Sequence, residues 1–196
     1  MPRPKTRPDR DVLAAALKLM HEKGPEALTF ASLAQLSGLS PSTLVQRFRN
    51  KEELARAALL HAWDELDAHT EAAIVAQPKT PEGSIGILMA LSGSYGGDSD
   101  SVEAYAEGLL MLREDFRDPV LRARGAAWGK RLAEAIDACF GGAVGAPENI
   151  GRLMASQWQG CLLWWGFDPT GPIDAYVRRN LEGFLGAVLQ RKAEIS

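Results

Sequence analysis

Residues 41–48, PSTLVQRF, carry side chains that could bind the edges of nucleobases. At 100° per residue of a helix, Ser42, Thr43 and Gln46 point away from Leu44, and Val45 lies at their flank. Hydroxyl and amide groups hydrogen-bond to base edges in the DNA major groove, and a valine can meet a thymine methyl. A polar outer face is also typical of any short surface helix, so this face alone leaves both interpretations open.

The elements that would position this face are two short helices within residues 29–48. Thr29 is suited to cap the first helix, and Gly38 ends it. Its inward-facing positions are Leu33, Ala34 and Leu36. Ser40 caps the second helix, and Pro41 takes its first position, where an N–H is not needed. Two short helices joined by a tight, glycine-containing turn form a helix-turn-helix, whose second helix enters the major groove.

The charges of the chain are divided unequally. Residues 1–56 hold 10 Lys or Arg against 6 Asp or Glu, whereas residues 57–196 hold 12 against 19. A short basic module suits a polyanion, and the acidic remainder would be repelled by one. We expect residues 1–8 to be a mobile basic arm, with Arg3, Lys5 and Arg7 along the DNA backbone or in a minor groove.

Residues 10–54 resemble the N-terminal DNA-binding domain of the tetracycline-repressor (TetR) family of bacterial regulators. The resemblance rests on an Ala-rich first helix ending at Gly24, on Thr29, on "LA" at 33–34, on Gly38, and on "STL", Phe48 and "NKEEL" in order. It implies an all-α fold, with an N-terminal three-helix helix-turn-helix domain and a helical domain for ligand binding and dimerisation. The expected division is an arm at 1–8, a DNA-binding domain at 9–55 and an effector and dimerisation domain at 56–196.

Two positions depart from the family pattern. Val45 stands where the family usually has Tyr, and Arg47 stands where it usually has His. Val45 cannot hydrogen-bond, whereas Arg47 adds a cation, so we expect operator sequence and salt dependence to differ from the family norm. The predicted base-contacting residues are Ser42, Thr43, Val45 and Gln46. The predicted DNA-binding set also includes Ser40 and three residues expected to hold phosphates, Thr29, Arg47 and Lys51.

The rest of the chain reads as further helices. One long helix is expected at 51–76, where it would connect the two domains, and others at about 82–94, 101–115, 118–140, 147–166 and 172–192. The last two are apolar over more than one face, which predicts either a two-fold four-helix interface or the ordinary core of one subunit. The residues predicted for the dimer interface are Trp158, Leu162, Trp165, Val177, Leu181, Phe184 and Val188.

The C-terminal part is also rich in aromatic and methionine side chains. Such side chains can line a pocket for an apolar or aromatic effector, although each of them taken alone is more often a core residue. The predicted pocket residues are Trp63, Met89, Tyr105, Met111, Trp128, Met154 and Trp158.

Other classes of protein have little support in the sequence. Cys139 and Cys161 form no CxxC or Cys/His cluster, and no apolar stretch reaches the length of a membrane span, which fits a cytoplasmic protein. No catalytic motif or phosphate-binding glycine loop occurs, so neither an enzyme nor a cofactor is expected. His61, Glu65 and His69 have the spacing of an incipient metal site, but a solvated helix face is the more common result.

The function predicted from the sequence is a homodimeric, ligand-responsive transcriptional regulator. It would repress by holding a palindromic operator, and would release that DNA when a small apolar or aromatic molecule binds the C-terminal domain. The alternatives are a DNA-binding dimer that takes no effector and, with less support, a metal-dependent helical protein.

Overall fold

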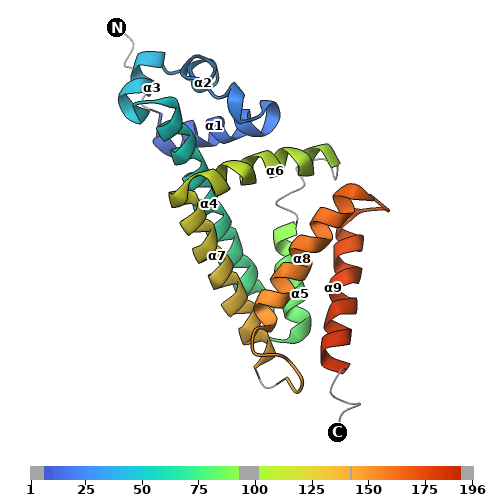
Figure 1. Cartoon of the computed structure of the whole chain (residues 1–196). Helices are drawn as coiled ribbons and strands as arrows, with labels where there is room; N and C mark the ends of the chain where they lie inside the picture. The colour runs from blue at the N-terminus through green and yellow to red at the C-terminus, as the bar shows by residue number, and fades with distance from the viewer. Residues whose placement is uncertain (1–6, 93–101, 142, 191–196) are drawn as a thin grey trace. The chain divides into compact units, whose positions relative to one another are not determined.

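The computed structural model describes residues 7–92, 102–141 and 143–190. Every regular element in these ranges is a helix, which confirms the predicted all-α class (Figure 1). Most of the predicted arm, including Arg3 and Lys5, lies outside the described ranges.

The helices follow the predicted ranges closely. They are α1 (Asp9–Lys23), α2 (Phe30–Ser37), α3 (Pro41–Phe48), α4 (Lys51–Ala76), α5 (Pro81–Ser92), α6 (Val102–Arg117), α7 (Pro119–Asp137), α8 (Ile150–Phe167) and α9 (Ile173–Gln190). Two short 3-10 turns, η1 (Pro25–Ala27) and η2 (Ala138–Phe140), complete the order. Pro8 is the N-cap of α1, and Asp9 lies inside its first turn.

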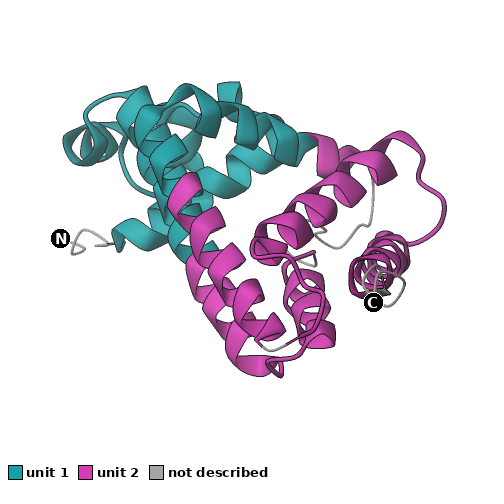
Figure 2. Ribbon diagram, turned by 60° about the horizontal axis from the view of Figure 1, so that its bottom comes forward, with its two compact units in different colours: residues 1–66, 107–125 teal, residues 67–106, 126–196 magenta. Residues whose placement is uncertain are grey.

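The chain packs as two compact units, which Figure 2 shows in different colours. Unit 1 contains Met1–Leu66 and Glu107–Gly125, and unit 2 contains Asp67–Ala106 and Ala126–Ser196. Helices α4, α6 and α7 each contribute residues to both units. Packing therefore attaches a distant segment to the helix-turn-helix, while the predicted functional division at residues 9–55 and 56–196 stays a prediction.

The core of unit 1 is apolar and joins the three N-terminal helices to α4, α6 and α7. Its members are Val12, Ala16, Leu17, Leu19, Met20, Leu28, Leu33, Leu44, Phe48, Leu54, Ala58, Leu59, Met111 and Leu121. Burial of a Leu or Phe side chain contributes about 1.5–3 kcal/mol, so these residues fix the mutual orientation of α1, α2 and α3.

The turn between α2 and α3 depends on one glycine. Gly38 is in the left-handed conformation, with φ of 70°, and its N–H donates to the carbonyl of Ala34. A side chain would strain this backbone, which is why glycine suits the end of α2. One turn after Leu33 it is Ser37 that is buried, whereas Leu36 is 50% exposed, so the prediction that Leu36 faces inward is wrong.

Three polar contacts join α4 to α6 and α7 within unit 1. Arg56 Nε donates to Asp118 Oδ2 at 2.6 Å, and Arg124 Nη2 donates to Asp64 Oδ1 at 3.1 Å. Trp63 Nε1 donates to the partly buried Asp115 Oδ1 at 3.1 Å. Because hydrogen bonds are directional, these contacts restrict how α4 can be oriented within the apolar packing of unit 1.

The carboxyls of Asp115 and Asp118 are perturbed in opposite directions. Burial raises the pKa of Asp115 above its ordinary value, and the hydrogen bond from Trp63 offsets this only in part. The hydrogen bond from Arg56 lowers the pKa of Asp118, and the N–H groups of Val120 and Leu121 at the start of α7 act in the same direction.

Unit 2 is built on α8, which packs against α9, while α5 packs against α9 from another side. The indole N–H groups of its buried tryptophans have partners: Trp158 donates to Ser92 Oγ at 2.8 Å, and Trp165 donates to the carbonyl of Gly171 at 3.0 Å. The start of α8 lies so close to α7 that a Cβ on Gly151 would collide with the carbonyl of Ala133. Glycine at position 151 is therefore a packing requirement.

Substitution of the two perturbed carboxyls should change stability in opposite directions near neutral pH. Asp115→Asn keeps an acceptor for Trp63 and removes a partly buried charge, so we expect the free energy of unfolding to rise. Asp118→Asn keeps an acceptor for the start of α7 and breaks the ion pair with Arg56, so we expect a fall of about 0.5–1 kcal/mol. Urea denaturation measures both changes.

The pH dependence of the two changes in the free energy of unfolding shows whether they arise from charge or from packing. The stability contributed by Asp118 is present above its unfolded pKa and is lost as pH falls through its lower folded pKa. Ionised Asp115 instead penalises the folded state as pH rises from the unfolded pKa through the higher folded one. Both differences from the unsubstituted chain should therefore shrink below the ordinary carboxyl pKa of about 3.9. Differences that persist unchanged in acid would contradict this account.

Candidate nucleic-acid interface

Helix α3 presents one continuous face to solvent. Ser42, Val45, Gln46 and Arg49 are exposed, at spacings of three, four and seven residues from the first. Leu44 and Phe48 are buried on the opposite side, and Thr43 is partly exposed at the edge. The structure thus brings together all four side chains predicted to contact bases, and Val45 is 43% exposed despite being apolar.

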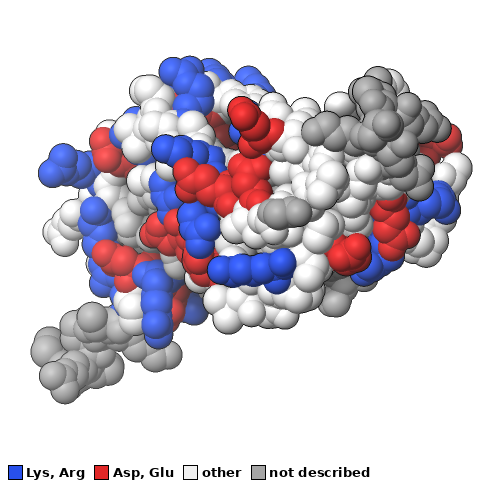
Figure 3. Space-filling view, turned by 90° about the horizontal axis from the view of Figure 1, so that it is seen from below, with Lys and Arg blue, Asp and Glu red and all other residues white. Residues whose placement is uncertain are grey.

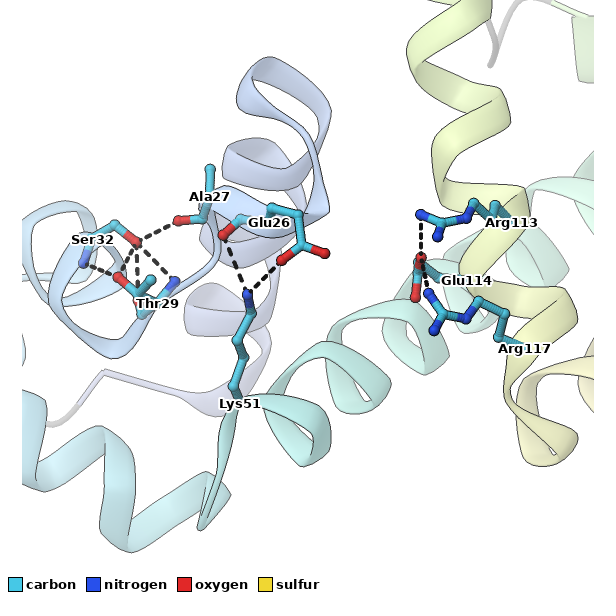
Figure 4. A network of polar contacts seen from close by, with 8 residues as sticks. All are labelled: Glu26, Ala27, Thr29, Ser32, Lys51, Arg113, Glu114 and Arg117. Carbon is cyan, nitrogen blue, oxygen red and sulfur yellow. Dashed lines mark hydrogen bonds and ion pairs between the residues drawn. The ribbon is translucent and has the colours of Figure 1, made fainter.

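Two hydroxyl groups set the helix starts around this face. Thr29 Oγ1 accepts from the N–H of Ser32 at 3.0 Å, and Ser32 Oγ accepts from the N–H of Thr29 at 3.0 Å, which forms a capping box for α2 (Figure 4). Ser40 Oγ accepts from the N–H of Thr43 at 3.1 Å and caps α3. The structure confirms both predicted capping roles. Thr29 and Ser40 are also exposed, so the phosphate contact predicted for Thr29 and the DNA contact predicted for Ser40 would add to these roles.

The predicted phosphate-binding cations differ in how they are held. Lys51 Nζ lies 3.2 Å from Glu26 Oε2 and 3.3 Å from the carbonyl oxygen of the same residue, as Figure 4 shows. Arg47 Nη1 lies 3.0 Å from Asp9 Oδ1. The side chain of Arg49, by contrast, makes no hydrogen bond or ion pair with another described residue, and its backbone has a φ of 63° at the end of α3. Arg49 is exposed at the residue that follows α3, three positions after Gln46.

Net charge by itself does not mark out an interface on the surface that Figure 3 shows. On that face, Lys and Arg side chains are interleaved with Asp and Glu side chains. Ion pairs such as that of Glu114 with Arg113 and Arg117, at 3.4 and 3.6 Å, are of this mixed kind. The face in Figure 3 therefore supplies no basic patch to the argument for DNA binding.

Comparison with known proteins agrees with this geometry. A family model described as "Bacterial regulatory proteins, tetR family" matches residues 12–58, which include most of α1, all of α2 and α3, and the face just described. Residues 12–58 thus carry the sequence pattern of the TetR family. The chain is 38% identical over 78 residues to the HTH-type transcriptional repressor ComR of Escherichia coli; the match covers 39% of this chain and only 37% of ComR.

Solved structures resemble most of the chain. The TetR-family regulator PfmR of Thermus thermophilus is 26% identical, with a TM-score of 0.61 and coverage of 89% of this chain and 96% of PfmR. The multidrug binding protein EbrR, in a complex with malachite green, is 20% identical, with a TM-score of 0.64 and coverage of 90% and 98%. At 20% identity the second likeness concerns the fold alone.

The residues predicted to line an effector pocket are divided between the two units. Trp63 and Met111 belong to unit 1, where both pack in or against its core. Met154 and Trp158 are fully buried in unit 2. The remaining three, Met89, Tyr105 and Trp128, are partly buried in unit 2.

A groove is present elsewhere in unit 2. Its volume is about 320 Å³, and it lies between α5 and α9, lined by Glu82, Ile85, Arg178, Glu182, Leu185, Gly186 and Leu189. None of the predicted pocket residues lines this groove, so the location of an effector site stays a prediction.

The structure corrects most of the predicted dimer interface. Trp158, Leu162, Trp165, Val177 and Leu181 are buried inside the chain itself, and side chains without exposed surface cannot touch a second subunit. They form the core of one subunit, which was the other interpretation of the same apolar pattern. Phe184 and Val188 are partly exposed, and for them the interface stays a prediction.

The described residues offer little to the metal-dependent alternative. Among them no group of three or more His, Cys, Asp or Glu side chains is arranged to hold a metal ion. His61 and Glu65 lie 3.5 Å apart as a pair. No helix within the described ranges is long and apolar enough to cross a membrane.

Proposed function

We propose that this chain is a cytoplasmic, dimeric transcriptional repressor that binds a palindromic operator through α3 and is released by a small apolar or aromatic effector. The observation that carries the proposal is the exposed face of α3, where Ser42, Val45, Gln46 and Arg49 stand opposite the buried Leu44 and Phe48. The match of residues 12–58 to the TetR family model and the partial likeness to the repressor ComR support the same function.

The roles proposed for individual residues follow from their surroundings. The side chain of Gln46 makes no hydrogen bond within the described part of the chain, so its amide is available to an adenine edge. Val45 would meet a thymine methyl, and the hydroxyls of Ser42 and Thr43 would add contacts to bases. Arg49 would hold a phosphate at the end of the helix.

Binding titrations with duplexes selected from a random library test the DNA contacts. Gln46→Ala should reduce the discrimination between selected and scrambled duplexes by about 1–3 kcal/mol, because it removes a base contact. Arg49→Ala should weaken binding to every duplex and lower the slope of log affinity against log salt by about 1. Lys51→Ala should have a smaller effect, because Nζ must first leave Glu26.

Gln77→Ala provides the control, since Gln77 is a partly exposed glutamine after the end of α4 and belongs to none of α3, α8 and α9. It should leave affinity and salt slope unchanged. If Gln46→Ala behaves like this control, the exposed face of α3 does not read sequence.

An aromatic effector fits the composition of the second unit, which contains Tyr105, Trp128 and Trp158. EbrR, a protein of the same fold, binds malachite green, an aromatic dye. Release would then require that the effector prefers the dimer state whose recognition helices no longer match successive major grooves, which lie about 34–36 Å apart. Helix α4 would transmit the change, because it begins after α3 and continues into unit 2.

Effector and operator should oppose each other by the same factor. A compound from a thermal-shift screen of aromatic molecules, malachite green included, should bind less tightly in the presence of saturating operator. The expected coupling is about 1–3 kcal/mol, and the operator affinity should fall by the same amount when the compound is present. Calorimetric titrations in both orders measure it. Equal compound affinities with and without operator would leave a DNA-binding protein that takes no effector.

The dimer face is proposed from the solvent side of α8. Trp164 and Phe167 are 64% and 75% exposed, with ring centroids 5.9 Å apart, and Leu153 and Leu163 are exposed on the same side. Gly160 lies among them, and a Cβ added there would meet no described atom within 4 Å. An exposed apolar face with room for close helix approach suits a second copy of α8 and α9.

Trp164→Glu should convert the dimer to monomers, because it places a charge in the apolar face. Light scattering should report the smaller mass, while circular dichroism reports unchanged helix content. Gln35→Glu is the control, since it adds the same charge at an exposed position of α2 in unit 1 and should leave the dimer intact. A Trp164→Glu protein that remains dimeric would place the interface elsewhere.

A further inference from the structure

Arg47 points towards the beginning of α1 and not towards the exposed face of α3. Its Nη1 donates to the carbonyl oxygen of Arg7 at 2.7 Å and to Asp9 Oδ1 at 3.0 Å. Its side chain is only 24% exposed, whereas the neighbouring Gln46 is exposed. One guanidinium thus links α3 to both the backbone before α1 and the first turn of α1.

Arg7 is held a second time through its own side chain. Its Nη1 donates to the carbonyl of Ser37 at 2.7 Å and to that of Leu36 at 3.3 Å. These carbonyls are at the end of α2, where helical partners are lacking. Residue 7 is therefore attached to α3 by its backbone and to α2 by its side chain, so it is fixed between the two helices of the helix-turn-helix.

We infer that Arg47 is a positioning residue that fixes the root of the N-terminal arm at Arg7, in place of the phosphate contact expected from the sequence. This inference rests on the proposed DNA binding. Arg3 and Lys5 precede Arg7 by four and two positions in the sequence. The attachment of Arg7 therefore tethers these two cations to the helix-turn-helix through the covalent chain, which raises their effective concentration at a bound duplex.

The two roles of Arg47 predict opposite effects of removing the charge of Asp9. If Arg47 held a phosphate, the Asp9 carboxylate would compete for it, and Asp9→Asn would strengthen DNA binding. If Arg47 fixes Arg7, Asp9→Asn loosens that attachment and weakens DNA binding even though a negative charge is lost. The sign of the change distinguishes the roles.

The experiment compares Asp9→Asn with Asp11→Asn in the full chain. Both aspartates lie in the first turn of α1 and contribute similarly to its helix dipole, but Asp11 pairs with Arg10 at 3.4 Å and not with Arg47. On a duplex selected from a random library, Asp9→Asn should weaken binding about 3- to 10-fold, whereas Asp11→Asn should leave it unchanged or slightly stronger. Equal strengthening by both substitutions would overturn the inference.

A second comparison tests whether the effect passes through the arm. In a full-length Arg3→Gln, Lys5→Gln background, Asp9→Asn should have little further effect, because the arm no longer carries the cations that the root positions. A full effect of Asp9→Asn in this background would overturn the link between Arg47 and the arm.

A third readout needs no DNA. The N–H groups of Asp11 and Val12 donate to the carbonyl of Pro8 at 3.1 and 3.3 Å, next to the root. Hydrogen exchange at these two amides should be faster in Asp9→Asn than in Asp11→Asn, and equal rates would contradict the attachment. Failure of the unsubstituted chain to prefer any duplex would reject the proposed function and the arm's part in it, while the exchange rates would still decide whether Arg47 fixes Arg7.

Discussion

Burial of Leu44 and Phe48 is the constraint on which the candidate interface depends. These two side chains lie four residues apart on α3, and both pack into the core of unit 1. Once they face inward, helical periodicity leaves Ser42, Val45 and Gln46 facing solvent. The caps at both ends of the turn then fix where α3 begins, so the pattern of exposed groups is set by packing and by hydrogen bonds that DNA does not need to supply.

The unit that carries this interface is larger than three helices. Met111 and Leu121 complete its core from a segment more than fifty residues further along the chain. Asp115 and Asp118 add polar contacts to α4 there. Helices α4, α6 and α7 each contribute residues to both units. A movement of one of these helices in unit 2 can therefore pass along the same helix into unit 1. That continuity is the physical basis of the coupling proposed between an effector and DNA.

Local features of the fold could be predicted from the sequence, and distant ones could not. Thr29, Gly38 and Ser40 act on their immediate neighbours, so their capping roles follow from residue type and spacing. The face of α3 follows from periodicity in the same way. An apolar stripe such as that containing Leu181 has the same period whether it faces its own core or a second subunit, which is why the interface prediction failed there. The pairing of Arg47 with Asp9 could not be predicted either, because the two residues are 38 positions apart in the sequence.

The composition of unit 1 bears on how its parts can be exchanged with those of relatives. A piece that ends at Leu66 would leave Arg56 and Trp63 without their carboxylate partners and would uncover the apolar surface that Met111 and Leu121 seal. The edge of the Trp63 ring also rests against Gly125, where a Cβ would lie only 3.1 Å from a ring carbon. A chimera that joins unit 1 to the C-terminal domain of a relative would therefore have to include residues 107–125, with glycine at position 125. The residues that pack together as unit 1 are thus discontinuous in sequence.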